Sequence, residues 1–184
     1  LRKSDDELAV LHSKKLEIIY LGMESGSDEV LRRVNKRDTS AEMIEAVHKA
    51  KRAGIRVSVI ALLGLGGVEL SAQHAAETGR VASAMDPHYL SMLTLMLVPG
   101  TPLHTQAQEG GFRLPSPAGL LDELRGVLQH TQGMSRCVFR TNHASNYLPL
   151  AGVLSRDTEA LLASIEAAQT KGPTALRPEN WRAL

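Results

Sequence analysis

The sequence predicts an α/β fold whose strands run parallel, and three observations support this. Apolar runs suited to buried strands recur at residues 16–23, 55–63 and 88–98. Segments with helical patterning and capping residues separate these runs. Each interval is long enough for a crossover helix, so right-handed parallel connections are expected. In such folds ligands bind at the carboxyl ends of the strands, which directs attention to the residues that follow each run.

The helix boundaries are predicted from capping residues and stop signals. Ser4 with Glu7, and Thr39 with Glu42, have capping-box spacing, and Gly54 supplies a C-terminal stop. The predicted helices are residues 4–15, a short helix capped by Ser27, 41–53, 71–84, 117–131 after Ser116, and a last helix capped by Ser155 that ends near residue 170.

The rest of the chain is predicted to be mostly irregular. A fourth strand is expected at residues 136–140, between a long loop over residues 101–115 and an irregular segment over residues 142–155. We expect residues 1–170 to form one domain and residues 171–184 a loose tail. So few strands cannot close a barrel, and the chain begins with Leu1 rather than Met, so we expect a piece of a longer polypeptide.

Composition excludes several classes of function for this stretch of chain. The 184 residues carry 21 basic and 20 acidic side chains, and a net charge of +1 gives no electrostatic case for nucleic acid or an anionic membrane. No apolar run approaches the length of a membrane span, and no signal peptide pattern is present. One cysteine, Cys137, excludes an internal disulfide and a self-contained cysteine metal cage. A cytoplasmic location is expected.

Three segments fall at the ends of the predicted strands: Glu24, residues 64–67 and residues 99–101. Each also has a purely structural interpretation. Glu24 suits the N-terminus of the helix that follows it, and the other two segments suit turns. Residues 64–67 lack phosphate-loop spacing, so we do not expect them to bind nucleotide phosphate.

The order and spacing of three longer segments carry a resemblance to a known family. They are LGMESGSDEVLRRVNK at residues 21–36, KRAGIRVSVIALLGLGG at 51–67 and DPHYLSMLTLMLVPGTPL at 86–103. Together they resemble the second half of the radical S-adenosylmethionine (radical SAM) enzymes. The narrower resemblance is to the anaerobic coproporphyrinogen oxidase, Elp3-like and cobalamin-associated relatives. It implies a partial TIM-like (βα)n barrel with parallel strands, truncated at its N-terminal half.

The resemblance implies a role for specific residues in binding S-adenosylmethionine. A carboxylate can accept two hydroxyl hydrogen bonds at once, which suits a ribose diol. The implied cofactor contacts are Glu24 and Ser25 on the ribose, Lys36 (with Arg37 beside it) on the methionine carboxylate, Gly64, Leu65 and Gly66 on the adenine and ribose, and Pro99, Gly100 and Thr101 near the adenine or the substrate. Ile60 stands where relatives often carry an acidic residue.

The same resemblance implies a four-iron four-sulfur cluster that this chain cannot hold. Radical SAM enzymes bind the cluster through three cysteines, usually C-x3-C-x2-C, and no such triplet occurs here. Cys137 lies in the wrong place to replace it. We therefore expect a separate N-terminal half-barrel to carry the cluster, and the chain alone to be inactive.

The densest polar stretch of the second half supplies candidate substrate contacts. Asn142, His143 and Asn146 follow the predicted fourth strand, where such enzymes vary their substrates. The alternative is a loop whose side chains bond their own backbone. His143 is the candidate acid or base, and the catalytic residue is otherwise unknown. The remaining histidines lack zinc-site spacing, so no metal site is expected.

The leading hypothesis is the C-terminal part of a radical SAM iron–sulfur oxidoreductase. Such an enzyme cleaves S-adenosylmethionine reductively to a 5′-deoxyadenosyl radical, which abstracts hydrogen from a substrate that the sequence does not identify. The alternative is a cluster-free α/β module that binds a nucleoside or serves in assembly. A third hypothesis is a non-redox barrel enzyme that uses His143. An open sheet also predicts self-association, or coverage of its apolar face by the loops.

Overall fold

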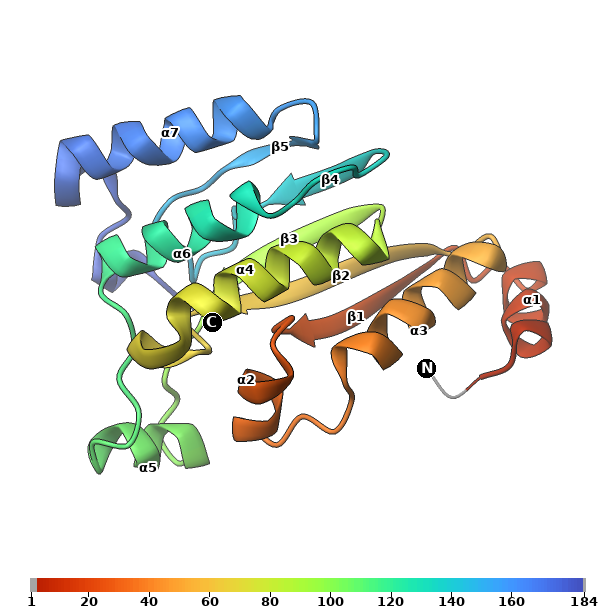
Figure 1. Ribbon diagram of the computed structural model, residues 1–184, viewed down its shortest axis with the longest axis horizontal. Helices are drawn as coiled ribbons and strands as arrows, with labels where there is room; N and C mark the ends of the chain where they lie inside the picture. Colours follow the sequence, from red (N-terminus) through yellow and green to blue (C-terminus); the bar gives the residue numbers. More distant parts are fainter. Residues whose placement is uncertain (1–2, 184) are drawn as a thin grey trace.

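The apolar runs become neighbouring strands of a five-stranded sheet in the computed structural model, which describes residues 3–183 (Figure 1). The strands lie side by side in chain order, and the first four are parallel. The fifth pairs antiparallel with the fourth. The strands are β1 (Ile18–Glu24), β2 (Arg56–Leu63), β3 (Tyr89–Thr94), β4 (Cys137–Arg140) and β5 (Ala151–Leu154).

Helices α3, α4 and α6 lie across one face of this sheet (Figure 1). Both predicted capping boxes are present, at Ser4 with Glu7 and at Thr39 with Glu42. The helices are α1 (Asp5–Ser13), α2 (Asp28–Arg33), α3 (Ser40–Arg52), α4 (Gly67–Met85), α5 (Pro102–Gln108), α6 (Pro117–Gln129) and α7 (Thr158–Lys171), followed by the short 3₁₀ helices η1 (Gly172–Ala175) and η2 (Glu179–Trp181).

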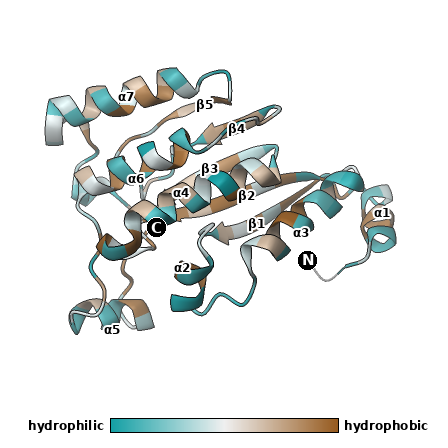
Figure 2. Ribbon diagram, in the orientation of Figure 1, coloured by the Kyte–Doolittle hydropathy of each residue, from teal (hydrophilic) through white to brown (hydrophobic). Residues whose placement is uncertain are grey.

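The two faces of the sheet differ sharply in burial. Val59, Met92 and Phe139 point to the helix-covered face and are completely buried. We call the opposite side the open face. Side chains alternate along a strand, so the open face carries the residues between the buried ones, and Tyr20 on it is 71% exposed. Figure 2 shows the strands largely in hydrophobic colours and α2 in hydrophilic ones.

Strand register aligns one row of residues across the open face. Gly22 pairs with Ile60, Ile60 with Ser91, and Ser91 with Arg140. This row lies close to the C-terminal ends of β1 and β4, so groups above it are near the edge where ligands bind in parallel α/β folds.

Two predicted boundaries in the central part of the chain were wrong. The third strand ends at Thr94 rather than near residue 98, because its neighbour β2 already ends at Leu63 and the last ladder bond is Leu95 N–H to the Leu63 carbonyl. Helix α4 begins at Gly67, four residues before the predicted start. Gly64 has φ +87° and accepts a bond from the Gly67 N–H, which turns the chain directly into the helix.

Further corrections concern segments whose structure depends on distant partners. The predicted loop at residues 101–115 contains α5, and the predicted irregular segment at residues 142–155 contains β5, which exists because it pairs with β4. Helix α7 has Asp157 rather than Ser155 at its N-cap. Ser27 precedes α2 without a side-chain capping bond. Its hydroxyl instead accepts a bond from Gln73.

The segment expected to be a loose tail folds back onto the loop after β4. Arg177 and Arg182 donate to backbone carbonyls of residues 143–146. Leu184, the last residue of that predicted tail, and residues 1–2 lie outside the described part of the chain.

The predicted fold class is confirmed. The sheet is mostly parallel, its helices cover one face, and the arrangement is that of a partial TIM-like barrel. Within residues 3–183, no helix combines the length and hydropathy that crossing a bilayer requires.

Candidate ligand-binding edge of the sheet

Glu24 ends β1 in an unusual backbone conformation. Its φ is +62°, in the left-handed region that few residues other than glycine adopt. The pairing of β1 with β2 also shifts register between Gly22 and Glu24. Strained conformations of this kind persist only where the surrounding structure holds them, and they cluster at functional sites.

The side chain of Glu24 folds back over Gly22 on the open face. A Cβ atom added to Gly22 would lie only 2.2 Å from Glu24 Oε1, so the space that glycine leaves is occupied by the carboxylate. Lys36 Nζ donates to the Gly22 carbonyl at 2.8 Å and lies 3.6 Å from Glu24 Oε1. Both side chains are 28% exposed and remain accessible from the open face. The sequence thus predicted two residues that the structure brings together.

Ser25 lies beneath this edge rather than on it. It is completely buried, and its hydroxyl lies 2.7 Å from His74 Nδ1 while accepting the N–H of Ser27. His74 Nε2 lies 2.9 Å from the Leu62 carbonyl, which can only accept. The ring is therefore protonated at Nε2, and Ser25 donates to Nδ1.

Glu123 of α6 extends the same buried group. Its two oxygens accept from the Gly64 N–H and from the Ser71 hydroxyl, both at 2.5 Å. His74 Nε2 lies 3.5 Å from Oε1. Burial lowers the pKa of His74 to about 4, against the opposing effect of its bond to the Leu62 carbonyl. Burial also raises the pKa of Glu123 to about 7, against its two hydrogen bonds.

The order Ser25, His74, Glu123 is that of a nucleophile, a base and an orienting acid. All three side chains are buried, and the Ser25 hydroxyl is already bonded on both sides. A substrate cannot reach it, so this group serves the structure of the edge and not nucleophilic catalysis.

The glycine turn after β2 is also enclosed. Gly64, Leu65 and Gly66 are buried, and a Cβ on Gly64 would lie 2.8 Å from Leu114 and 3.0 Å from Leu120. Residues 114–120 therefore cover this turn. By contrast, Pro99 and Gly100 are exposed, beyond the end of β3 and just before α5.

The predicted substrate contacts divide into one buried residue and two exposed ones. Asn146 uses both amide atoms at the end of β3: Nδ2 donates to the Met92 carbonyl, and Oδ1 accepts from Thr94, each at 2.8 Å. Asn142 and His143 are exposed, with His143 Nδ1 bonded to the Ser145 hydroxyl at 2.9 Å. The loop lies at the same edge as Glu24, at the end of β4.

The residues that hold these elements were not predicted from the sequence. His74 and Glu123 support the first two strand ends, and Arg177 and Arg182 support the loop after β4. One signal was present, because His74 and Thr78 are four residues apart on a helix and so share a face. Nothing local marked Glu123 or the two arginines.

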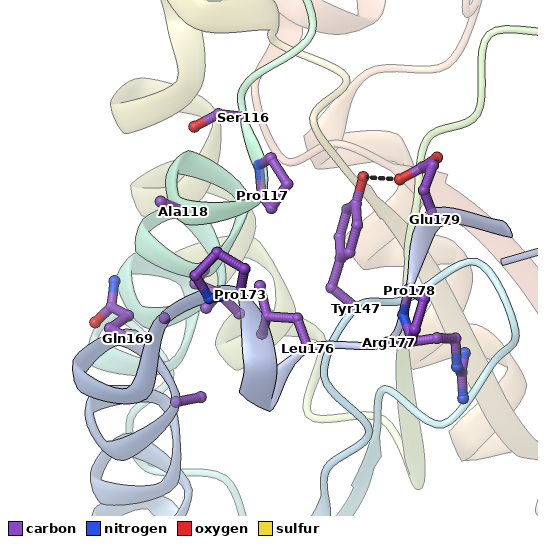
Figure 3. A pocket seen from close by; sticks show the side chains of 13 residues that line it. Ser116, Pro117, Ala118, Tyr147, Gln169, Pro173, Leu176, Arg177, Pro178 and Glu179 are labelled. Carbon is purple, nitrogen blue, oxygen red and sulfur yellow. Dashed lines mark hydrogen bonds between the residues drawn. The ribbon is translucent and has the colours of Figure 1, made fainter. Parts of the chain in front are cut away.

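An apolar cavity of about 470 Å³ lies between α6, α7 and the C-terminal segment. In Figure 3, Pro117, Pro173 and Leu176 lie on its walls, and the Tyr147 hydroxyl donates to Glu179 at 2.5 Å. It is formed by different residues from those around Glu24, and none of the predicted site residues lines it.

Of the two groups that the resemblance implies, the residues present fit S-adenosylmethionine and not an iron–sulfur cluster. The carboxylate over Gly22 and the ammonium beside it suit the ribose and amino-acid ends of S-adenosylmethionine. An iron–sulfur cluster does not fit. Cys137 is buried, burial raises its thiol pKa to about 12, and residues 3–183 contain no group of three metal-ligating side chains.

Comparisons with known proteins agree with this fold. Residues 1–78 match the family model of the radical SAM superfamily, which confirms the resemblance drawn from the sequence. No curated protein matches the chain. An N-terminally deleted Elp3 from the archaeon Methanocaldococcus infernus has a similar structure, with a TM-score of 0.61 and 18% identity over 92% of this chain and 39% of that one.

Coproporphyrinogen III oxidase (HemN) from Escherichia coli, a radical SAM enzyme, is also similar. Its TM-score is 0.53 and its identity 16%, over 83% of this chain and 42% of that one. At these identities the likeness shows the fold alone. The chain thus spans less than half the length of either solved structure.

Proposed function

We propose that this chain forms the S-adenosylmethionine-binding C-terminal part of a radical SAM enzyme. The proposal proceeds from the match of residues 1–78 to the radical SAM superfamily. The supporting evidence is the superfamily match, the barrel-like sheet and the group formed by Glu24 and Lys36 at its edge. The substrate remains unidentified, and the exposed side chains of Asn142 and His143 are candidates to contact it.

One observation carries this proposal: the Glu24 carboxylate lies over Gly22 on the open face. The two oxygens of a carboxylate can accept one hydrogen bond from each of the two hydroxyls of a ribose. Lys36 stands beside it with a compact positive charge that suits the methionine carboxylate. When bound and reduced, S-adenosylmethionine supplies a 5′-deoxyadenosyl radical. The residues of this chain bind and orient it.

The cluster thiolates and the covering of the open face must come from elsewhere. We propose that an N-terminal half-barrel supplies both, since β1 is an edge among the described strands and Tyr20 on the open face is 71% exposed. The sequence upstream of this chain should then contain C-x3-C-x2-C.

The first test is anaerobic reconstitution of the longer polypeptide with iron and sulfide. We expect cluster absorbance and formation of 5′-deoxyadenosine from S-adenosylmethionine and a reductant. An upstream sequence without the three cysteines, or a reconstituted protein without either signal, would exclude the radical SAM activity.

The second test is Glu24→Ala in that polypeptide. We expect weaker S-adenosylmethionine binding by about 1–3 kcal/mol, the scale of hydrogen bonds to a charged group. Isothermal titration measures the dissociation constant. Glu45→Ala removes an exposed carboxylate on α3 and serves as the control. An unchanged constant in Glu24→Ala would remove the ribose assignment.

A second candidate is a cluster-free module that binds a nucleoside. The lack of a thiolate triplet in this stretch favours it, and Glu24 would serve the same ribose contact. This candidate predicts that the chain binds adenosine as tightly as S-adenosylmethionine, whereas a contribution from Lys36 predicts a preference for the latter.

A further inference from the structure

The turn that follows Glu24 rests directly on helix α4. A Cβ atom on Gly26 would lie 2.4 Å from the backbone carbonyl oxygen of Glu77, so only glycine permits this approach. The Gly26 N–H donates to the Thr78 hydroxyl at 2.9 Å. Gln73 donates to the Ser27 hydroxyl at 3.3 Å. The turn thus contacts one helix through its backbone and through side chains.

His74 joins this turn to the neighbouring strand. Ser25 donates to Nδ1 on one side of the ring, and Nε2 donates to the carbonyl of Leu62 in β2 on the other. His74 and Thr78 are both completely buried. Water cannot replace a lost partner of these buried polar atoms, so loss of any one of these hydrogen bonds destabilises the folded state.

We propose that His74 and Thr78 are positioning residues that fix the turn after Glu24 and thereby hold its carboxylate over Gly22. This inference rests on the proposed role of Glu24 in binding the ribose. Glu24 adopts a positive φ that its own side chain does not favour, and residues 25–27 follow it immediately. A strained residue keeps its conformation only if its neighbours are held, and α4 holds them.

The substitution Thr78→Val removes the hydroxyl that accepts the Gly26 N–H and that also lies 3.4 Å from His74 Nδ1. Valine has nearly the shape of threonine but cannot accept the Gly26 N–H, while Thr78→Ser restores an acceptor. Ser83→Ala is the matched control, because it removes a part-buried hydroxyl from the same helix. Ser83 donates to the carbonyls of Gly79 and His130 and accepts the Gln132 N–H, and none of these residues belongs to the turn. His74→Asn tests the role of the imidazole ring, because the side-chain carbonyl of the new asparagine can still accept a hydrogen bond from Ser25.

The first measurement is residue-resolved amide hydrogen exchange on this chain without ligand. We expect the Gly26 and Ser27 amides to exchange about tenfold faster in Thr78→Val, as loss of one buried bond implies, with β2 amides unchanged. Thr78→Ser restores slow exchange, and Ser83→Ala leaves the turn unchanged. Equal acceleration in the turn and in β2 would show global destabilisation only and would overturn the proposal.

The second measurement is the dissociation constant for S-adenosylmethionine in the longer polypeptide. We expect Thr78→Val to raise it about tenfold, with rescue by Thr78→Ser and no change in Ser83→Ala. A loosened turn with unchanged affinity would overturn positioning. Absence of binding in the wild type would instead refute the proposed function, and the exchange result would still decide whether α4 fixes the turn.

Discussion

At the scale of single residues, Gly22 and Glu24 depend on each other. Glycine leaves open the space above the strand, and the carboxylate two residues later occupies it. Lys36 approaches from the loop after α2 and bonds the Gly22 carbonyl. A strand followed by an acidic residue in the sequence therefore forms a polar group on the open face of the sheet.

Gly22→Ala tests this dependence. The new methyl group would lie 2.2 Å from Glu24 Oε1, so the carboxylate must move from its place over Gly22. We expect S-adenosylmethionine affinity in the longer polypeptide to fall about as much as in Glu24→Ala, by about 1–3 kcal/mol. Titration calorimetry measures it, with Gly111→Ala as a control, because the nearest atom to a Cβ added there is 3.5 Å away. Wild-type affinity in Gly22→Ala would contradict the assigned geometry.

The buried pair His74 and Glu123 should give opposite pH dependences. The pKa of Glu123 is raised from 4.5 to about 7, so its contribution to folding is complete below pH 4.5 and is lost as pH rises through 7. The pKa of His74 is lowered from 6.5 to about 4, so its contribution is complete above pH 6.5 and is lost as pH falls through 4. Between about pH 4.5 and 6.5 the two trends oppose each other.

Urea denaturation from pH 4 to 8 separates the two groups. Relative to wild type, Glu123→Gln should gain unfolding free energy as pH rises from 4.5 to 7. His74→Asn should gain it relative to wild type as pH falls from 6.5 to 4. Parallel curves for wild type and a variant would show that the substituted group does not titrate differently on folding.

At the scale of elements, the loop after β4 is held from two sides. Asn146 bonds the end of β3, and Arg177 from the C-terminal segment donates to the carbonyls of His143, Ala144 and Asn146 at 2.9, 2.8 and 3.0 Å. Neighbouring Arg182 lies 4.0 Å from the centre of the Tyr147 ring. The chain's last described segment therefore shapes the edge of the sheet.

Arg177→Ala should destabilise the protein by about 1–2 kcal/mol, since charge-assisted bonds to three carbonyls are lost at a partly exposed site. Chemical denaturation measures the change. Arg125→Ala, which removes an exposed helical ion pair, should cost less than about 0.5 kcal/mol. Equal effects of the two substitutions would mean that Arg177 adds nothing beyond a surface charge.

Local sequence signals predicted the elements whose boundaries are set by residues close in sequence. The capping boxes at Ser4 and Thr39 and the proline start of α6 fixed helix ends because those bonds join residues close in sequence. Strand β5 escaped prediction because its existence depends on pairing with β4. Helix α7 began later than expected, where Asp157 bonds the Val153 N–H inside the preceding strand.

At the scale of the whole molecule, the sheet has one covered and one open face. Helices bury the first, while on the second Tyr20 is 71% exposed. Strand β1 is also an unpaired edge among the described strands. A parallel sheet normally has both faces covered, so we expect the open face to contact another surface.

The chain studied alone should therefore self-associate and bind a hydrophobic dye. Tyr20→Lys places a charge on the open face of the edge strand and should reduce both signals. Analytical ultracentrifugation and dye fluorescence provide the measurements, and Trp181→Lys, at another exposed aromatic residue, provides the control. A wild-type chain that is monomeric with little dye fluorescence would argue against an open apolar face in solution.

The sequence by itself determined the α/β class, the parallel direction of the first strands and the position of Glu24 at a strand end, because periodicity, caps and connection lengths are local properties. Only the tertiary structure decided which residues surround that glutamate. It placed the carboxylate over Gly22, took Ser25 and Asn146 into buried hydrogen bonds, and brought His74 and Glu123 beneath the edge. Apart from the contact of Glu24 with Gly22, these contacts join residues tens of positions apart, and they form only when helices pack on a completed sheet.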